Sequence, residues 1–216
     1  MSLITLKNVK KEYGKNQVLF ENLSLEIEKG EFVGFVGKSG AGKTTLLNII
    51  GLITDISAGE ITIGGYKNLS MNNKNAMLLR RHTIGYLFQN YGLVEDENVL
   101  WNLKLALEYK KMNKSEKLRI INKYLKQFGL SGMLNKKIYQ LSGGEQQRIA
   151  IIKLILQGSK IILADEPTSG LDEDNEAIVM GLLKKLNEAG VTIIMVTHNM
   201  HLCDSFSRVI NVENYR

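Results

Sequence analysis

Residues 37–45 read Gly37-Lys-Ser-Gly-Ala-Gly-Lys-Thr-Thr45. This stretch matches the phosphate-loop pattern G-x-x-x-x-G-K-[ST], which ends on Lys43 and Thr44. The preceding residues, Glu31–Val36, form a short and mostly apolar run that is typical of a buried strand. The following residues, Leu46–Ile50, are apolar enough to begin a helix. The order of strand, glycine loop and helix predicts a binding site for a nucleoside triphosphate.

The residue types in this loop suit phosphate chemistry. Glycine lets the backbone turn back on itself and point successive N–H groups at an anion. A helix that starts after the loop adds unpaired N–H groups and the positive end of its dipole. The Lys43 ammonium is expected to reach the terminal phosphates, and the Thr44 hydroxyl to hold Mg²⁺. A glycine-rich turn that matches by chance is the simpler alternative, and the strand and helix around the loop argue against it.

The composition indicates a globular protein with a substantial core, since 44% of its 216 residues are apolar. This length suits one domain with an inserted subdomain. No stretch approaches the roughly 18 consecutive apolar residues of a membrane helix, and Met1–Leu6 lacks the features of a signal peptide. The single cysteine, Cys203, excludes an internal disulfide and fits a reducing compartment. We therefore expect a protein in the cytosol or facing it.

The net charge of +6 is concentrated in one segment. Between Lys104 and Lys137 lie ten of the 28 basic side chains and only two of the 22 acidic ones. Two interpretations stay open. The basic residues could simply cover solvated helix faces, or they could form a surface that lies close to anionic lipid head groups or an acidic partner loop.

Strands and helices are expected to alternate along the chain. Leu3–Glu28 contains two extended segments separated by a polar break at Tyr13–Asn16, which predicts an antiparallel pair. Between Val99 and Lys137, apolar residues recur at three- and four-residue spacing, which predicts helices. Further strands are expected at residues 59–63, 83–89, 161–164, 191–196 and 208–212, and further helices at 75–82, 145–156 and 172–188.

This order predicts an α/β protein with a P-loop NTPase core, in which helices cover both faces of a mostly parallel sheet. We expect an antiparallel β subdomain at the N-terminus and an α-helical subdomain inserted into the core. Residues 1–89 and 141–216 should form the nucleotide-binding core with the β subdomain, and residues from about 90 to 140 the helical subdomain, within one domain of residues 1–216.

Two acidic residues, Asp165 and Glu166, follow the apolar run Ile161–Ala164. A strand that ends in Asp places a carboxylate at the carboxyl edge of the sheet, where open α/β sheets bind ligands. Asp165 is therefore expected to complete the Mg²⁺ shell through a water, and Glu166 to act as the general base for an attacking water. The alternative, a solvated turn, is weakened by the phosphate loop upstream.

A second possible anion site lies at Leu141–Glu145, which reads Leu-Ser-Gly-Gly-Glu. Ser142 and Glu145 have the spacing of a capping box, so Ser142 is expected to cap a helix. The two glycines leave backbone N–H groups bare at the start of that helix. A simple N-cap explains the pattern by itself. Alternatively, because one small domain rarely needs two phosphate cradles for one nucleotide, the second cradle serves a nucleotide held by another subunit.

These motifs together resemble the ATPase domains of ABC transporters. The matching positions, in the order that this family has, are Gly37–Thr45, Gln89, Leu141–Glu145, Asp165–Glu166, Ser169–Asp172 and His198. They look like Walker A, the Q-loop, the signature, Walker B, the D-loop and the switch histidine, and they cover essentially the whole chain. The resemblance implies a head-to-tail dimer in which ATP lies between the Walker A of one copy and the signature of the other.

The resemblance also implies individual roles. Tyr13 would stack on adenine, and Gln89 would contact Mg²⁺ and the attacking water. His198 would contact the γ-phosphate and orient Glu166, while Asp172 would lie at the dimer seam. The nucleotide contacts implied across the two copies are Gly37, Lys38, Ser39, Gly40, Ala41, Gly42, Lys43, Thr44 and Thr45 from one chain and Ser142, Gly143 and Gly144 from the other. Lys43, Gln89, Glu166 and His198 would support hydrolysis; Thr44, Gln89 and Asp165 would hold Mg²⁺.

Two departures from the family pattern stand out. The usual Ala-Arg-Ala stretch after the signature is replaced by Ile151-Ile-Lys-Leu154, and Ser159-Lys160 stands where a proline usually precedes the Walker B strand. Neither change touches a phosphate-contacting position, so they bear on the branch of the family and leave the expected activity intact.

Three functional classes fit the motifs: the ATPase subunit of a membrane transporter, the ATPase of a non-transporting membrane complex, and a soluble ABC protein acting on ribosomes or DNA. The chain has one ATPase unit, only 51 residues between Gln89 and Leu141, and one cysteine, which argue against the third class and against a nucleic-acid partner. The helical insertion is of the size that docks the coupling helices of an integral membrane permease.

Within the membrane classes, Tyr86–Gln89, Leu141–Arg148 and Ala164–Pro167 resemble the macrolide-export and lipoprotein-release branch, which includes bacteriocin and antimicrobial-peptide exporters. The expected protein is an ATP- and Mg²⁺-dependent ATPase at the cytoplasmic face of the membrane. It would pair with a second copy of itself and drive export or extraction of a peptide, lipoprotein or antimicrobial compound by a separate permease.

Overall fold

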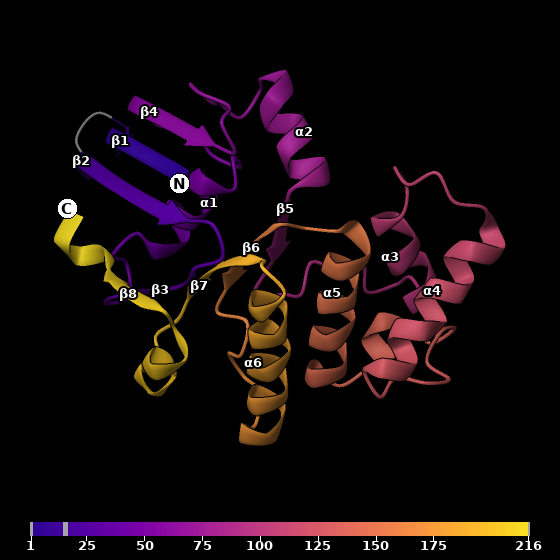
Figure 1. Cartoon of the computed structure of the whole chain (residues 1–216). Coiled ribbons are helices and arrows are strands. Elements are labelled where there is room, and N and C mark those ends of the chain that lie inside the picture. Colours follow the sequence, from indigo (N-terminus) through magenta and orange to yellow (C-terminus); the bar gives the residue numbers. More distant parts are fainter. Residues whose placement is uncertain (1, 15–16, 216) are drawn as a thin grey trace.

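Two β-sheets organise the chain in the computed structural model, which describes residues 2–14 and 17–215 (Figure 1). The polar break predicted at Tyr13–Asn16 includes Lys15 and Asn16, which lie outside the described residues. The strands are β1 (Ser2–Tyr13), β2 (Gln17–Glu28), β3 (Phe32–Val36), β4 (Ala58–Ile63), β5 (Ile84–Leu87), β6 (Ile161–Asp165), β7 (Thr192–Val196) and β8 (Arg208–Asn211). The helices are α1 (Lys43–Ile50), α2 (Lys74–His82), α3 (Val99–Ala106), α4 (Lys114–Gln127), α5 (Gly143–Gln157) and α6 (Glu173–Glu188), with short 3₁₀ turns η1 (Ile138–Gln140), η2 (Met200–Ser205) and η3 (Val212–Tyr215).

The larger sheet has the strand order β5-β6-β7-β3-β8, and every neighbouring pair in it is parallel. Strands β3 and β7 are buried along their whole length, as expected for a parallel sheet that is covered on both faces. Successive side chains of β3 point to opposite faces of the sheet. Val33 and Phe35 pack into the core that contains α1, whereas Phe32 packs with α5 and α6. The predicted parallel α/β core is confirmed.

The smaller sheet is antiparallel and has the order β2-β1-β4. The predicted pair within Leu3–Glu28 is therefore correct, and β4 adds a third strand on the free edge of β1. Alternating residues in the second half of β2 point into the core, so that Leu23, Leu25 and Ile27 are buried between polar neighbours. They pack in the same cluster as α1, which fixes this sheet above the phosphate loop.

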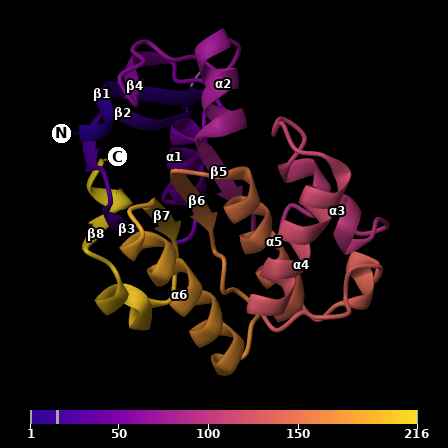
Figure 2. The same cartoon turned by 45° about the vertical axis from the view of Figure 1, so that its right-hand side comes forward.

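Helices α3 and α4 form a separate apolar core with one side of α5, away from the sheets (Figure 2). Helix α5 is shared between two cores, since Ile152 belongs to the core of α3 and α4 while Ile151 and Leu154 pack with α6 and the parallel sheet. A helix that is apolar on both sides is expected where it is buried between two units. This position explains the Ile-Ile-Lys-Leu stretch that departs from the family pattern.

Some element boundaries differ from the predictions. Strand β5 ends at Leu87, so Gln89 lies in the turn after it and does not end the strand. Helix α1 begins at Lys43, three residues earlier than expected, because Gly42 caps it in the left-handed conformation. Helix α5 begins at Gly143, directly after its Ser142 cap. Among the described residues, we find no helix both long and apolar enough to span a bilayer.

Candidate nucleotide-binding site

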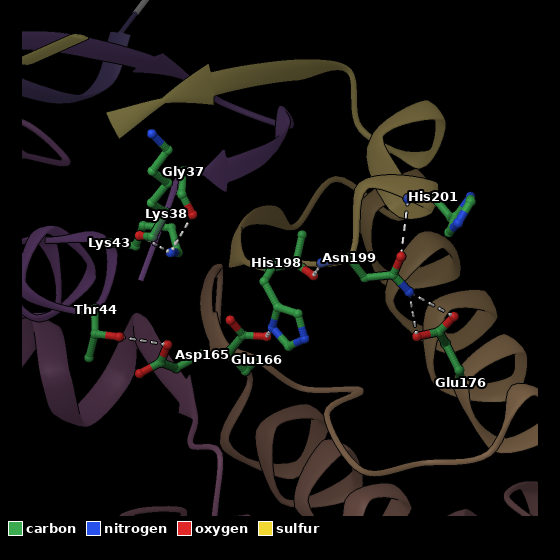
Figure 3. Close-up of polar contacts among 11 residues, drawn as sticks. Gly37, Lys38, Lys43, Thr44, Asp165, Glu166, Glu176, His198, Asn199 and His201 are labelled. Carbon is green, nitrogen blue, oxygen red and sulfur yellow. Dashed lines mark hydrogen bonds and ion pairs between the residues drawn. The ribbon is translucent and has the colours of Figure 1, made fainter. Parts of the chain in front are cut away.

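A cleft of about 410 Å³ brings together residues from six separate parts of the chain. Figure 3 shows Lys43, Thr44, Asp165, Glu166 and His198 from this lining. The residues that line it are Tyr13, Gln17, Leu19, Ser39, Gly40, Gly42, Lys43, Thr44, Thr45, Gln89, Asp165, Glu166, Ser169, Val196 and His198. Strands β3, β5, β6 and β7 are parallel, so their carboxyl ends lie at one edge of the sheet. The loops that follow these strands carry the phosphate loop, Gln89, Glu166 and His198.

The phosphate loop has the backbone that its glycines permit. Gly37, Gly40 and Gly42 have φ angles of 140°, 75° and 95°, which side chains other than glycine rarely adopt. A Cβ atom on Gly42 would lie 2.8 Å from the Phe20 ring, so the loop has no room for one. A Cβ atom on Gly40 would meet nothing within 4 Å, so the loop is closely packed at Gly42 and open at Gly40.

Lys43 lies within this loop and is 8% exposed. Its ammonium donates hydrogen bonds to the carbonyl oxygens of Gly37 and Lys38, at 2.7 and 2.9 Å. A buried cation needs such partners, because an unpaired charge away from water is costly. These hydrogen bonds hold the ammonium against the backbone of the loop, and Lys43 lines the cleft.

The residues predicted to hold Mg²⁺ are adjacent. The Thr44 hydroxyl donates to Asp165 Oδ1 at 3.1 Å, and Gln89 lines the same cleft. Burial raises the pKa of Asp165, while the Thr44 hydrogen bond opposes the rise and the Glu166 charge adds to it. A hydroxyl, a carboxylate and an amide oxygen are hard ligands of the kind Mg²⁺ prefers. The donor set therefore fits this ion.

Glu166 and His198 form a close pair beside this cluster. His198 Nδ1 lies 2.6 Å from Glu166 Oε2, so with its proton on Nδ1 the ring donates to the carboxylate. Glu166 has a φ angle of 49°, in the left-handed region, and its backbone N–H donates to the Val196 carbonyl at 3.1 Å. Such conformations cost about 1–3 kcal/mol and concentrate at functional sites. The strain aims the carboxylate into the cleft.

Tyr13 lies at the rim of the cleft. Its hydroxyl is 3.5 Å from the Thr45 hydroxyl, and the Lys11 ammonium lies 4.7 Å from the ring centroid. The ring is 46% exposed. This position beside the end of the phosphate loop suits stacking on a nucleotide base, which stays a prediction.

The signature residues do not reach this cleft. Ser142, Gly143 and Gly144 are absent from its lining among the residues that the structure describes. Ser142 instead caps α5: its Oγ accepts from the Glu145 N–H at 3.3 Å, and the Glu145 carboxylate accepts from the Ser142 N–H at 2.7 Å. The predicted capping box is present, and the two predicted phosphate cradles are separate within one chain.

Several residues around the site belong to no recognisable sequence motif. The Glu213 carboxylate accepts a 2.7 Å hydrogen bond from the backbone N–H of Lys38, so that this N–H is engaged by the C-terminal turn η3. Gln17 and Leu19 also line the cleft, as does Ser169 of the predicted D-loop. Asn199, next to His198, donates to the Glu176 carboxylate on α6 at 3.3 and 3.5 Å (Figure 3). Glu213 is 175 residues from Lys38 in the sequence, and no local motif marks it.

The sequence model of the ABC transporter family matches residues 20–169 of the chain. The chain belongs to this family. The ABC cassette formed by this chain is 40% identical over 215 residues to the ABC transporter ATP-binding protein MJ1508 of Methanocaldococcus jannaschii, and the alignment covers 98% of the cassette and 96% of that protein.

Longer relatives also match the cassette. It is 41% identical over 212 residues to the macrolide export ATP-binding/permease protein MacB of Campylobacter jejuni, an alignment that covers 98% of the cassette and 33% of MacB. The cassette thus spans about a third of the length of the MacB relatives that it matches.

Solved structures show the same fold. The ATP-binding cassette MJ0796, described as a dimer in a post-hydrolysis state bound to ADP and Pi, has a TM-score of 0.87 and 38% identity, over 96% of this chain and 93% of that chain. A further dimeric structure of MJ0796, described as a bacterial ABC transporter cassette, matches equally well. The P-loop NTPase fold predicted from the sequence is confirmed.

Proposed function

We propose that the cassette binds and hydrolyses ATP to power a membrane exporter. The observation that carries this proposal is the single cleft in which Lys43, Thr44, Asp165, Glu166 and His198 converge, although they come from distant parts of the sequence. Each supplies a function that phosphoryl transfer requires: phosphate binding, metal binding and water activation. The family membership agrees with this chemistry.

The residues divide the work in a definite way. Lys43 and the loop N–H groups bind the phosphates, and Thr44, Asp165 and Gln89 hold Mg²⁺. When bound, Mg²⁺ neutralises negative charge on the phosphate oxygens. The Glu166 carboxylate accepts a proton from the attacking water. His198, at 2.6 Å, orients this carboxylate, and its ring is exposed toward the open side of the cleft, where a γ-phosphate would lie.

The separation of the two cradles supports a dimer. Among the described residues, the signature does not line the cleft that contains the phosphate loop. A head-to-tail pair places the signature of one copy over the phosphate loop of the other, and each interface then buries a nucleotide. The relative MJ0796, solved as a dimer, agrees with such an assembly.

A membrane permease is the proposed second partner. Two adjoining grooves, of about 260 and 410 Å³, lie between the core and the helical insertion and share Arg80, Lys153 and Gln157 in their lining. Exposed apolar side chains, Phe88 and Leu105, border them. Cationic, partly apolar grooves suit a docking segment that carries both apolar and acidic residues.

The direction of transport follows from the relatives. The MacB proteins that match the cassette are named as macrolide exporters that contain an ATP-binding part and a permease. We extend this to export or extraction of a peptide, lipoprotein or antimicrobial compound. A cassette docked to a permease in this way would lie at the cytoplasmic face of the membrane.

The variant Glu166→Gln tests the proposed reaction. It keeps the hydrogen bond to His198 but cannot accept the proton, so steady-state ATP hydrolysis should fall by about 10²-fold or more. ATP binding should be retained, and an ATP-bound dimer should accumulate in gel filtration. The exposed acid Glu188, changed to Gln, is the matched control and should behave like the parent chain. Undiminished hydrolysis by Glu166→Gln would refute the assignment of the base.

A further inference from the structure

The two signature glycines are each covered by a side chain from another element. A Cβ atom on Gly143 would lie 2.9 Å from the Tyr91 hydroxyl, and a Cβ atom on Gly144 would overlap the Asn175 carboxamide. Neither glycine has a positive φ angle. A Cβ at Gly144 would therefore displace the Asn175 side chain, and one at Gly143 would push the Tyr91 hydroxyl aside, so both glycines lie in close contact with other elements of the chain.

Tyr91 reaches Gly143 from the segment that follows Gln89. It holds a φ angle of 63°, which costs a non-glycine residue about 1–2 kcal/mol. The next residue fixes this strained turn, because the Gly92 carbonyl accepts a 2.8 Å hydrogen bond from the Lys153 ammonium. Lys153 is largely buried, and burial lowers its pKa.

Lys153 and Gly143 lie on the same helix, α5, ten residues apart. This spacing corresponds to about 15 Å along the helix axis. The segment after Gln89 is therefore attached to α5 at two separated points, through Tyr91 at the start of the helix and through Lys153 farther along it. Because the segment holds α5 at two separated points, a movement of the segment can rotate the helix as well as shift it. A single contact could only shift it.

Asn175 reaches Gly144 from the first turn of α6. Its side-chain amide donates to both carboxylate oxygens of Asp172, at 3.0 and 2.9 Å, and its carbonyl oxygen accepts from the Arg148 guanidinium at 3.0 Å. The Asn175 backbone N–H also donates to Asp172, at 2.8 Å; this bond and then those of the side-chain amide lower the pKa of Asp172. Asn175 thus joins the start of α6 to the start of α5, and its own rotamer is fixed by partners on both helices.

Both contacts lead back to the ATP cleft of the same chain. Gln89, two residues before Tyr91, lines that cleft, and so does Ser169, three residues before Asp172. Tyr91 and Asn175 themselves do not line it. They lie between the cleft that a chain uses for its own nucleotide and the signature that it offers to a partner copy.

We propose that Tyr91 and Asn175 are positioning residues that fix the signature glycines relative to the chain's own ATP cleft. The half-site offered to the partner copy then responds to the nucleotide in the chain's own cleft, which couples the two sites of a dimer. This inference rests on the head-to-tail dimer of the proposed function.

The test combines Tyr91→Ala and Asn175→Ala, singly and together, with Glu166→Gln to stop hydrolysis. ATP affinity of the dilute, monomeric chain is measured with a fluorescent ATP analogue, and ATP-dependent dimerisation by analytical ultracentrifugation. We expect ATP affinity within about twofold of the parent and a dimer dissociation constant raised about tenfold or more. The same substitutions are also made in chains that keep Glu166 and hydrolyse ATP. In these chains the Hill coefficient for ATP hydrolysis should fall toward one.

Conservative and surface variants control the experiment. Tyr91→Phe removes only the hydroxyl that lies nearest Gly143 and keeps the ring, so it should weaken dimerisation less than Tyr91→Ala does. Tyr139→Ala and Asn122→Ala alter an exposed tyrosine and an exposed asparagine and should leave every measurement unchanged. Thermal unfolding monitored by circular dichroism identifies variants that fail to fold.

The results separate the two proposals. If the Glu166→Gln parent itself does not dimerise with ATP, the proposed dimer fails and this inference falls with it. If the parent dimerises and the double variant dimerises equally well with an unchanged Hill coefficient, the positioning role is overturned while the proposed function stands. Loss of monomer ATP affinity together with dimerisation would also overturn it, because the role would then be general structural support.

Discussion

The Asp165 carboxylate, which is proposed to hold Mg²⁺, lowers the stability of the folded protein when it is ionised. Its carboxylate lies at the end of β6 and accepts a hydrogen bond from Thr44, yet burial still raises its pKa. A raised pKa in the folded state means that the ionised carboxylate destabilises the folded protein in the absence of a cation. A bound Mg²⁺ would offset this destabilisation, because its positive charge stabilises the ionised carboxylate.

We predict that Asp165→Asn stabilises the nucleotide-free cassette at pH 7 and abolishes ATP hydrolysis. Removing a buried charge should raise the thermal midpoint by a few degrees, whereas the loss of a metal ligand should lower kcat about 10²-fold or more. The parent gains stability as the pH falls through the folded pKa of Asp165. The difference in thermal midpoint between the variant and the parent should therefore shrink at acidic pH. Calorimetry from pH 7 to pH 4 measures this; a constant gap would contradict it.

At the scale of an element, the helical insertion carries the charge excess of the protein. Its basic side chains, among them Lys110, Lys111 and Lys114, are exposed, so the structure agrees with solvated helix faces. The same segment borders the proposed permease grooves, since Tyr109 lines one of them with the Arg81 guanidinium 4.0 Å from its ring. The basic side chains can therefore be exposed to solvent in the free chain and still lie close enough to the grooves to contact a partner.

We predict that reversing Lys110, Lys111, Lys114 and Lys117 to Glu weakens association with the permease and leaves ATP affinity unchanged. The first three side chains are exposed and Lys117 is half-buried, and none of the four lines the ATP cleft. Co-purification of the permease from detergent-solubilised membranes should fall severalfold, and more at low salt than at high salt. The control variant reverses Lys184 and Lys185 to Glu on α6, which makes the same charge change per residue outside the helical insertion. Equal permease recovery from both variants would sink the prediction.

At the scale of the whole molecule, the separation of phosphate loop and signature makes complementation possible. In a head-to-tail dimer, each site combines the phosphate loop of one copy with the signature of the other. A copy with Lys43→Ala loses the first half, and a copy with Ser142→Arg loses the second. A mixed dimer of these two copies retains one site in which both halves are intact.

We predict that mixing the inactive Lys43→Ala and Ser142→Arg chains restores ATP hydrolysis. Random pairing of equal amounts leaves about a quarter of the sites intact, which sets the upper limit of recovered activity. Ser142→Arg also removes a helix cap, worth about 1 kcal/mol, so its folding is checked by thermal unfolding. The phosphate-release rate of the mixture, compared with each chain alone, decides the result. No recovery would exclude composite sites.

Local patterns in the sequence were enough to predict the ligand class and most of the fold. The phosphate loop, the acidic strand end and the capping box at Ser142 are local patterns, in which neighbouring residues already impose the chemistry. Buried strands such as Ile161–Asp165 are recognisable because apolar runs have few alternatives. Gln89, predicted to contact Mg²⁺, lines the cleft, although β5 ends two residues before it.

Only the tertiary structure decided which distant residues meet. Glu213 at Lys38, Tyr91 on Gly143 and Asn175 on Gly144 are contacts between elements, and no local preference encodes them. The same holds for the Ile-Ile-Lys-Leu stretch, which is unusual as a motif and becomes intelligible once α5 lies between two cores. The physical reason is that packing between elements depends on their three-dimensional arrangement, whereas motifs depend on the covalent order of a few residues.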